Sequence, residues 1–289
     1  MSQNGRITYL ISHFNETALY YIWNQVCFNL TFGKMCPNAR DCCVLWHEAI
    51  AGRRGCDVAS AVLFFLVKQQ AAFRHFRIWC DNCAPQNKNW ILFSALLSLV
   101  NSAQGPDSVT LRYLEKGHTF MKADSIHGAI GRRLRREKEV LEFSQLCSVI
   151  STSLKSGLVL QMDASDFLPL MSIKDKKLAS YPKLRSIKEV QSQKGSKFLF
   201  FKLNLEAVAH FKRPLANGAV PQLPPSNCVY RGINIEKKEK ITKSLLPLMP
   251  LCSRAFWNNL HVADVNDLCS CIDTKADWVR SLLSSWFIL

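Results

Sequence analysis

Residues 76–89 read FRIWCDNCAPQNKN, a short apolar run that stops abruptly at an aspartate and continues as a polar loop. The run 76–80 predicts a strand that delivers Asp81 to its end, and the apolar residues from 87 to 100 predict a helix directly after the loop. In sheets with this strand–helix order, polar residues at the carboxyl ends of adjacent strands converge on a site.

The segments on either side continue the alternation. Before it, residues 19–32 predict a bent strand or a pair of strands, residues 44–46 a short apolar run, and residues 57–67 a buried helix. After it, residues 109–114 alternate like a strand and residues 125–142 predict a helix. This order predicts an α/β fold, a mixed sheet with flanking helices.

The character of the chain changes near residue 151. We expect two parts, a core over 1–150 and a basic C-terminal α+β extension over 151–289. The extension contains a lysine-rich stretch at 174–212 and a proline-rich connector at 219–225. A basic helix at 236–251 and an aromatic anchor at Phe256 and Trp257 follow.

Composition excludes several classes of protein. With 48% hydrophobic and 20% charged residues, the 289-residue chain is of globular type rather than mainly disordered. Its longest uncharged apolar stretch, 90–100, is far shorter than the roughly 20 residues that span a bilayer, so no membrane partner is expected. The run 7–11 is too short for a secretory signal, which predicts an intracellular protein.

The formal net charge of +15 is spread over both halves of the chain. A polyanion, and nucleic acid above all, is the partner that this charge favours.

Twelve cysteines at irregular spacings predict reduced, buried small side chains rather than a disulfide framework. Cys80 and Cys83 form a CxxC that could belong to a zinc or redox site. A structural zinc needs about four ligands, and no second CxxC or spaced histidine pair accompanies this one, so a structural role is favoured.

Asp81 is the first candidate for chemistry. A carboxylate at a strand end can bind Mg²⁺, which prefers oxygen ligands. The alternative is that Asp81 caps the following helix or forms an Asx-turn, and the residues alone favour neither. Four polar residues follow it as possible supporting groups: Asn82, Gln86, Asn87 and Lys88.

A second cluster follows the strand 109–114. Asp124 is a candidate second metal ligand, with His118 or His127 positioning a water or a phosphate. The alternative is that Asp124 caps the helix that starts at Ser125. The two roles are compatible, because a helix N-terminus also favours an anion.

Two further groups carry charge near these sites. Glu48 could be a third carboxylate, although a pair with a neighbouring arginine is the stronger expectation. A dense basic segment on the predicted helix suits phosphate contacts, and a solvated face or a nuclear-localisation signal would explain it equally well: Arg132, Arg133, Arg135, Arg136 and Lys138.

Four sequence blocks resemble a family of transposon-derived proteins in animal genomes. The blocks are WCDNCAPQNKNW at 79–90, YLEKGHTFMKADSIHGAIGRR at 113–133, LWHEAIAGRRGCDVAS at 45–60, and GINIEKKEKITKSLLPLMP at 232–250 followed by Phe-Trp. The resemblance implies a ribonuclease H-like core of the integrase or transposase type. It also implies a nuclear, DNA-binding protein with a Mg²⁺ or Mn²⁺ site.

Within that resemblance, Asp81 matches the second carboxylate of the metal site, on the fourth strand, and Asp124 is the best match to the last one. The family's first-strand aspartate block is missing, since residues 1–18 contain no aspartate and Glu16 lies in a polar setting. Loss of one ligand should cost orders of magnitude in rate.

The sequence therefore predicts an N-terminally truncated or domesticated transposase relative. We expect it to bind nucleic acid, most plausibly DNA, with its metal-dependent nuclease activity lost. The alternative is a non-catalytic protein-interaction module whose strand-end aspartates are structural.

Overall fold

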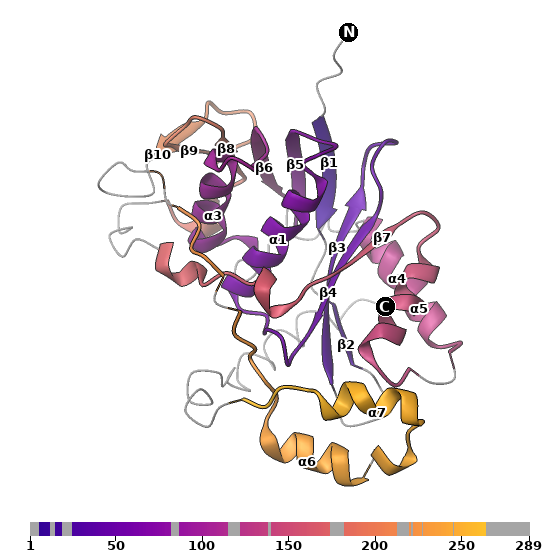
Figure 1. The fold of residues 1–289 in the computed structure, drawn as a ribbon. Coiled ribbons are helices and arrows are strands. Elements are labelled where there is room, and N and C mark those ends of the chain that lie inside the picture. The colour runs from indigo at the N-terminus through magenta and orange to yellow at the C-terminus, as the bar shows by residue number, and fades with distance from the viewer. Residues whose placement is uncertain are drawn as a thin grey trace.

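The computed structural model of the chain describes residues 6–11, 15–18, 25–81, 87–114, 122–137, 140–173, 182–212, 220, 222–226, 228–244 and 246–263. Its strands form one ten-stranded sheet with helices packed on both faces, which confirms the predicted α/β class (Figure 1).

The strands run across the sheet in the order β10-β9-β8-β6-β5-β1-β3-β4-β7, and β2 pairs with β3 beside this path. Their bounds are β1 Arg6–Ile11, β2 Asn15–Ala18, β3 Val26–Lys34, β4 Cys42–His47, β5 His75–Cys80, β6 Ser108–Tyr113, β7 Leu158–Gln161, β8 Glu189–Gln193, β9 Leu199–Lys202 and β10 His210–Lys212.

The helices are α1 Gly55–Gln69, α3 Trp90–Asn101, α4 Lys122–Leu134, α5 Phe143–Ser153, α6 Ile235–Ser244 and α7 Leu251–Asn258. Short 3-10 turns are η1 Ala164–Asp166, η2 Leu170–Ile173, η4 Leu184–Ser186 and η5 Leu246–Leu248.

The centre of the sheet is parallel. β1 pairs in parallel with β5, and β5 pairs in parallel with β6, so that Ile11, Cys80 and Tyr113 lie level with one another. β3 is antiparallel to β1, with Phe32 opposite Ile11. The carboxyl ends of β1, β5 and β6 therefore meet at one edge of the sheet.

One face of the sheet, here the α1–α3 face, carries the larger core. Side chains of β3 and β4 alternate, and every second one packs with α1 and α3 in this cluster. The Phe32 ring stacks on the Phe65 ring of α1 with centroids 3.7 Å apart. In α3, nine of the twelve residues are buried, which matches the predicted apolar helix at this point.

The opposite side, here the α4–α5 face, has a smaller core. Cys27, Cys43 and Leu45 pack there with residues of α4 and α5 such as Ile126 and Leu146. α4 also contacts β1, so this helix lies over the middle of the sheet as well as over β3.

Several predicted elements differ in extent. The helix predicted over 125–142 is two helices: α4 starts at Lys122 and ends at Leu134, and α5 begins at Phe143. In the segment predicted as strand over 19–32, β3 begins at Val26, and residues 19–24 lie outside the described part. The strands β1 and β2 were not predicted.

The boundary expected at residue 150 does not divide the sheet. β7 pairs with β4 and β8 pairs with β6, so residues beyond 150 complete the same sheet on both sides. The physical reason is that β-pairing joins residues far apart in sequence, which a shift in composition cannot reveal.

The helices α6 and α7 form a lobe at the end of β4, drawn at the bottom of Figure 1. Trp257 is buried in a small core with Ala49, and its indole N–H donates a 2.8 Å hydrogen bond to the Leu141 carbonyl. The predicted role of Trp257 as an anchor is confirmed. The basic helix predicted over 236–251 ends earlier, at Ser244.

No described helix combines the length and the apolar character that crossing a membrane requires. The described cysteines are all free thiols, and five of them are buried: Cys27, Cys42, Cys43, Cys80 and Cys147. Burial raises the pKa of the Cys43 thiol to about 11 and of the Cys147 thiol to about 12. These side chains are neutral core residues, as predicted.

Candidate functional site

The carboxyl end of β5 holds a buried polar cluster. Asp81 is only 1% exposed, and the Asn87 side-chain amide donates a hydrogen bond to Asp81 Oδ1. Asn87 is itself 4% exposed, and its Oδ1 is buried without a hydrogen-bond partner in the described structure. Asp81 directly follows the end of β5, and Asn87 lies three residues before the start of α3 at Trp90.

Lys88 completes the cluster. Its side chain is fully buried, with Nζ 4.6 Å from the centroid of the Tyr113 ring and 3.5 Å from the Arg185 carbonyl oxygen. The Tyr113 hydroxyl donates a 2.7 Å hydrogen bond to the Asn87 carbonyl. β5, β6 and the segment before α3 thus enclose a carboxylate, an amide and an ammonium group together.

Both charged groups act on the neighbouring Cys80 thiol. Burial raises the pKa of its thiol well above 9.0, the Asp81 carboxylate raises it further, and the Lys88 ammonium opposes both. Tyr113 also has a raised pKa, first because of burial and then because of Cys80 and Asp81. A buried carboxylate and ammonium in one place compensate each other's charge, as buried ions must.

Asn89, rather than Asp81, caps α3. α3 begins at Trp90, and the Asn89 side chain accepts a 2.9 Å hydrogen bond from the backbone N–H of Leu92. Residues 82–86, which directly follow Asp81, lie outside the described part, so a cap or an Asx-turn at Asp81 stays a prediction.

Asp124 lies in the first turn of α4 and is exposed. Because α4 starts three residues earlier than predicted, Asp124 is not its cap, although an acidic side chain in the first turn still stabilises a helix through the macrodipole. One turn later, burial lowers the pKa of His127 to about 4, and the Asp124 carboxylate opposes this shift. His127 is consequently a neutral imidazole at pH 7.

α4 crosses the sheet near the strand end that carries Asp81. The Ala123 backbone nitrogen lies 3.3 Å from where a Cβ of Gly33 would be, so the absence of a side chain lets α4 approach β3 closely. Gly33 is level with Trp79, two strands away from β5. Two strand spacings and two residues of rise put the backbones of Gly33 and Asp81 roughly 12 Å apart.

Glu48 lies elsewhere. It accepts a 2.9 Å hydrogen bond from the Val26 N–H and forms an ion pair with Lys237, rather than with the arginine that the sequence favoured. The register puts Glu48 three strands and five residues away from Asp81, roughly 22 Å. Glu48 therefore holds the C-terminal lobe against β3 and is not a third carboxylate beside Asp81.

Four exposed arginines lie at the C-terminal end of α4 and just beyond it: Arg132, Arg133, Arg135 and Arg136. Arg133 pairs with Glu137 at 2.8 Å. Cations in the last turn stabilise the helix by themselves, so this arrangement is compatible with both a structural and a phosphate-binding role.

Some candidates fall outside the described residues, namely Asn82, Gln86, His118 and Lys138, as does Cys83 of the CxxC. In the described part, no group of three or more His, Cys, Asp or Glu side chains could hold a metal ion. The buried Asn87 Oδ1 and the Asp81 carboxylate are oxygen donors of the kind Mg²⁺ prefers, but Lys88 brings a positive charge next to them. The described donors alone do not amount to a metal centre.

Sequence reasoning missed a polar cluster at the carboxyl end of β4. Tyr230 donates a 2.9 Å hydrogen bond to Asp163 and stacks on His261 with ring centroids 3.8 Å apart. His47 is the last residue of β4; burial lowers its pKa to about 4, the Asp163 carboxylate opposes this shift, and His261 adds to it. Only the dipeptide His47-Glu48 after an apolar run pointed to this place, because the other members come from distant segments.

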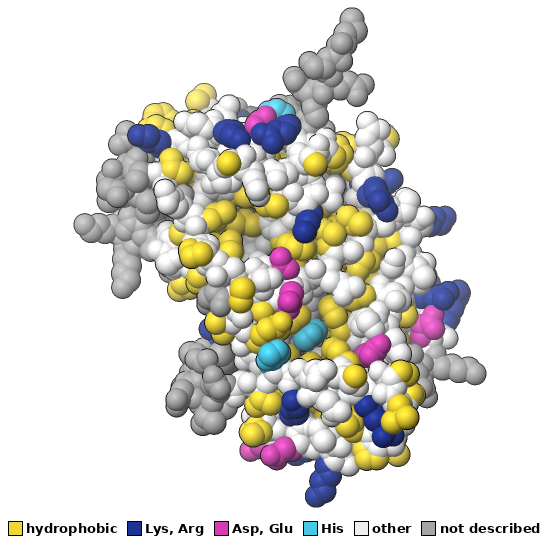
Figure 2. All heavy atoms as spheres, viewed as in Figure 1, with side chains coloured by type: hydrophobic (Ala, Val, Ile, Leu, Met, Phe, Trp, Pro, Cys, Tyr) yellow, Lys and Arg dark blue, Asp and Glu magenta, His cyan; other side chains and the backbone are white. Residues whose placement is uncertain are grey.

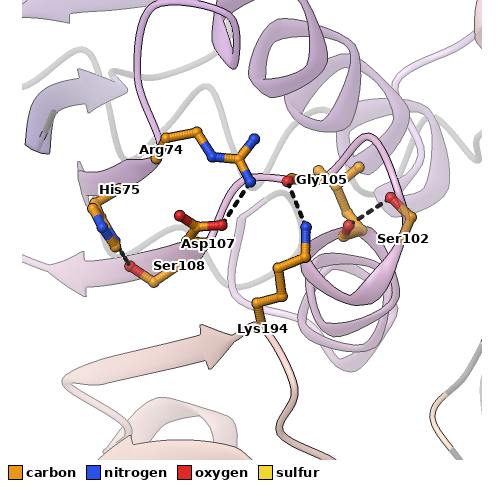
Figure 3. Close-up of polar contacts among 8 residues, drawn as sticks. Arg74, His75, Ser102, Gly105, Asp107, Ser108 and Lys194 are labelled. Atoms are coloured by element: carbon orange, nitrogen blue, oxygen red, sulfur yellow. Dashed lines mark hydrogen bonds and ion pairs between the residues drawn. The ribbon is translucent and has the colours of Figure 1, made fainter.

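At the opposite edge of the sheet, polar contacts fasten the corner between α3 and β6 (Figure 3). Arg74 pairs with Asp107 at 2.6 Å, His75 Nδ1 lies 3.0 Å from the Ser108 hydroxyl, and Lys194 reaches the Gly105 carbonyl at 3.5 Å. These contacts connect neighbouring loops, and we assign this corner a structural role.

A family model described as a domain of unknown function (DUF7869) matches residues 54–214, more than half of the chain. The match begins just before α1 and ends just after β10, so it contains Asp81 and Asp124 and leaves out the α6–α7 lobe. No curated protein and no solved structure matches the chain.

Proposed function

Because the chain belongs to the DUF7869 family, whose description assigns no activity, we propose a function from its own residues. The domain binds nucleic acid on a ribonuclease H-like core, and its metal-dependent phosphoryl transfer is lost or vestigial. The transposase ancestry, the nuclear location and the preference for DNA are parts of this proposal that rest on the sequence resemblance.

The observation that carries the proposal is the position of β1. If carboxylates on the first and fourth strands of a core are to share metal ions, those strands must be parallel neighbours. β1 and β5 are parallel neighbours, with Ile11 level with Cys80, the residue before Asp81. β2 is a four-residue strand beside β3, so β5 is the fourth of the longer strands.

The same strand supports the loss of catalysis. β1 has the sequence RITYLI, without an acidic residue, so it offers no partner carboxylate beside Asp81. A two-metal mechanism needs carboxylates that hold both ions about 3.5–4 Å apart. Asp81 and Asp124 would remain as a reduced set, and Lys88 next to Asp81 further disfavours a second cation.

Charge supports nucleic acid as the partner. The net charge is +15, and on the face drawn in Figure 2 the Lys and Arg side chains are scattered rather than gathered in one patch. The exposed arginines at the C-terminal end of α4 and just beyond it are the densest basic group in the sequence, and Asp124 lies on the same helix.

Binding of a fluorescent duplex at increasing salt concentrations tests the proposal. The double variant Arg132→Gln/Arg136→Gln should weaken binding and reduce the slope of log K against log salt by about 1.8, two phosphate contacts' worth. The matched control is Lys240→Gln/Lys243→Gln on α6, which removes the same charge from exposed positions outside the family match. Equal effects of both pairs would reduce the proposal to unspecific attraction.

A nicking assay with Mg²⁺ or Mn²⁺ tests the catalytic part. We expect at most weak cleavage, abolished by Asp81→Asn and by Asp124→Asn. Strong cleavage that survives both substitutions would contradict the assignment of these aspartates.

A protein-interaction module is the second candidate function. The α6–α7 lobe exposes large apolar side chains, with Leu248 81% and Leu251 79% exposed. This function predicts that oligonucleotides fail to bind even at about 50 mM salt, where phosphate contacts are strong.

A further inference from the structure

The α4–α5 face is only partly covered by helices in the described structure. α4 and α5 contact β1, β3 and β7, whereas the helix that packs on β6, β8 and β9 is α3, from the other side. Among the described helices, the larger contacts to β6, β8 and β9 therefore come from the α1–α3 face.

Strand pairing identifies the side chains on the opposite face of these strands. Trp79, Arg112, Glu189 and Lys202 are successive partners across β5, β6, β8 and β9, so they project on one side. The contacts agree, because the Arg112 guanidinium lies 5.4 Å from the Trp79 ring centroid and forms an ion pair with Glu189.

A second row runs parallel to the first. Thr110 and Gln191 connect Arg77 on β5 to Phe200 on β9, and Phe200 is opposite Phe211 on β10. Since residues two apart on a strand share a face, both rows lie on the same side as Gly33 and α4. We call six of these side chains the open face: Arg77, Trp79, Arg112, Phe200, Lys202 and Phe211.

The open face contains accessible aromatic rings. Phe211 is 64% exposed, and its ring centroid lies 5.3 Å from that of Phe198 and 6.5 Å from that of Phe200. Trp79 and Phe200 are half-buried. These three rings lie outside the hydrophobic clusters of the described core. The faces of rings at a surface can stack with planar groups.

The charges of the two rows are mostly positive. Arg77, Arg112 and Lys202 are cationic, and Glu189 is the one acidic side chain of the two rows, where it is 6% exposed and paired with Arg112. A second copy of this face would bring like charges together, so self-association through it is disfavoured. An anionic partner is favoured.

From these observations we propose that the open face binds single-stranded nucleic acid. Bases stack on Phe211, Phe200 and Trp79, while phosphates contact Arg77, Arg112 and Lys202. Aromatic rings between basic residues suit unpaired bases, whereas a duplex hides its base faces inside its own stack. This inference rests on the proposed function and specifies the form of nucleic acid that the protein selects.

Anisotropy titrations of two labelled probes test it, an oligothymidylate of about 16 nucleotides and a duplex of equal length. Phe211→Ala should weaken oligothymidylate binding about tenfold, the loss of one stacked base, and leave duplex binding unchanged. The matched control is Val208→Ala, which removes an 87% exposed apolar side chain from the loop before β10. Lys202→Gln should reduce the oligothymidylate salt slope by about 0.7.

The outcomes separate the two proposals. If neither probe binds, the proposed function fails and this inference fails with it. If the duplex binds and the oligothymidylate does not, or if Phe211→Ala leaves oligothymidylate affinity unchanged, the nucleic-acid function stands and the open face is overturned. The open face is also overturned if sedimentation shows a dimer that Phe211→Ala dissociates without a change in oligothymidylate affinity.

Discussion

Among single residues, Asp81 and Lys88 are the most unusual, because both are charged and almost completely enclosed. Such groups are stable inside a protein only when neighbouring charges and hydrogen bonds replace water. Here the Asn87 amide, the Tyr113 ring and the Arg185 carbonyl supply that environment. Asp81 therefore stabilises the fold whether or not it also binds a cation.

This role predicts unequal effects of the two aspartates on stability. Asp81→Ala should lower the free energy of unfolding by about 3 kcal/mol, because it leaves a buried ammonium without its compensating charge. Asp124→Ala, at an exposed position, should change it by about 0.5 kcal/mol. Urea denaturation measures both, and equal small effects would mean that Asp81 is not part of the buried charge cluster.

The two partly or fully buried histidines predict a loss of stability in acid. Burial lowers the pKa of His47 and of His127 from 6.5 to about 4. The unfolded chain takes up these protons below pH 6.5 and the folded protein resists them. The stability is therefore fully present above pH 6.5 and is lost as the pH falls towards 4, by about 3 kcal/mol per histidine.

Unfolding free energies at a series of pH values measure this loss. His47→Leu cannot be protonated, so its stability should vary less between pH 6.5 and 4 than that of the wild type. An unchanged pH profile in this variant would show that His47 titrates normally in the folded protein.

For single residues, the sequence predicted which side chain follows a strand but not which groups surround it in the fold. The abrupt end of an apolar run indicated that Asp81 follows a strand, and β5 ends at Cys80 as expected. The burial of Lys88 was not predictable, because it depends on Tyr113 from the next strand and on a carbonyl at Arg185, almost a hundred residues away. Glu48 was misjudged for the same reason, since Lys237 is its distant partner.

For helices and strands, the sequence pattern predicted correctly those elements that local interactions stabilise. The predicted helix 57–67 lies within α1, and the predicted strand 109–114 differs from β6 by one residue at each end. The division between α4 and α5 was missed because the segment between them lacks proline and glycine, so no residue there marks a break. β1 was missed because its stability comes from pairing with β3 and β5 rather than from its own composition.

The close packing between the end of α3 and the loop before β6 can be tested by a substitution. A Cβ on Gly105 would lie 1.7 Å from the Leu99 carbonyl oxygen, which already accepts a hydrogen bond from Ser102 (Figure 3). Gly105→Ala should therefore force the end of α3 away from the loop and lower the free energy of unfolding by about 3 kcal/mol.

The matched control is Gly128→Ala in α4, where a Cβ would meet Arg132 at an ordinary 3.5 Å. This substitution should stabilise the protein by about 0.5–1 kcal/mol, because alanine favours the helix. Thermal unfolding of both variants gives the comparison, and a Gly105→Ala protein as stable as the wild type would contradict the close packing of this corner.

The molecule as a whole is one sheet with two unequal cores and an added lobe. The sequence predicted the α/β class and the aromatic anchor of the lobe, but it put a boundary at residue 150 where the sheet continues. The family match, which runs from 54 to 214, crosses this position as the sheet does.

This architecture predicts the order in which described thiols react in the native protein. Cys228 and Cys252 are exposed and should be alkylated at once, whereas Cys42, Cys43 and Cys80 should react only as the sheet unfolds. Mass-spectrometric mapping of the modified cysteines over time measures this order. Rapid labelling of Cys80 in the folded protein would show that the carboxyl end of β5 opens readily.

The central position of β1 has a consequence for synthesis on the ribosome. β1 emerges before every other described strand, and its antiparallel partner β3 follows soon, but its parallel partner β5 emerges only after β4 and α1. Until then one side of β1 is an open hydrogen-bonding edge that a neighbouring nascent chain can join. We expect this interval to be when newly made chains depend most on chaperones, and it ends once β5 closes the gap.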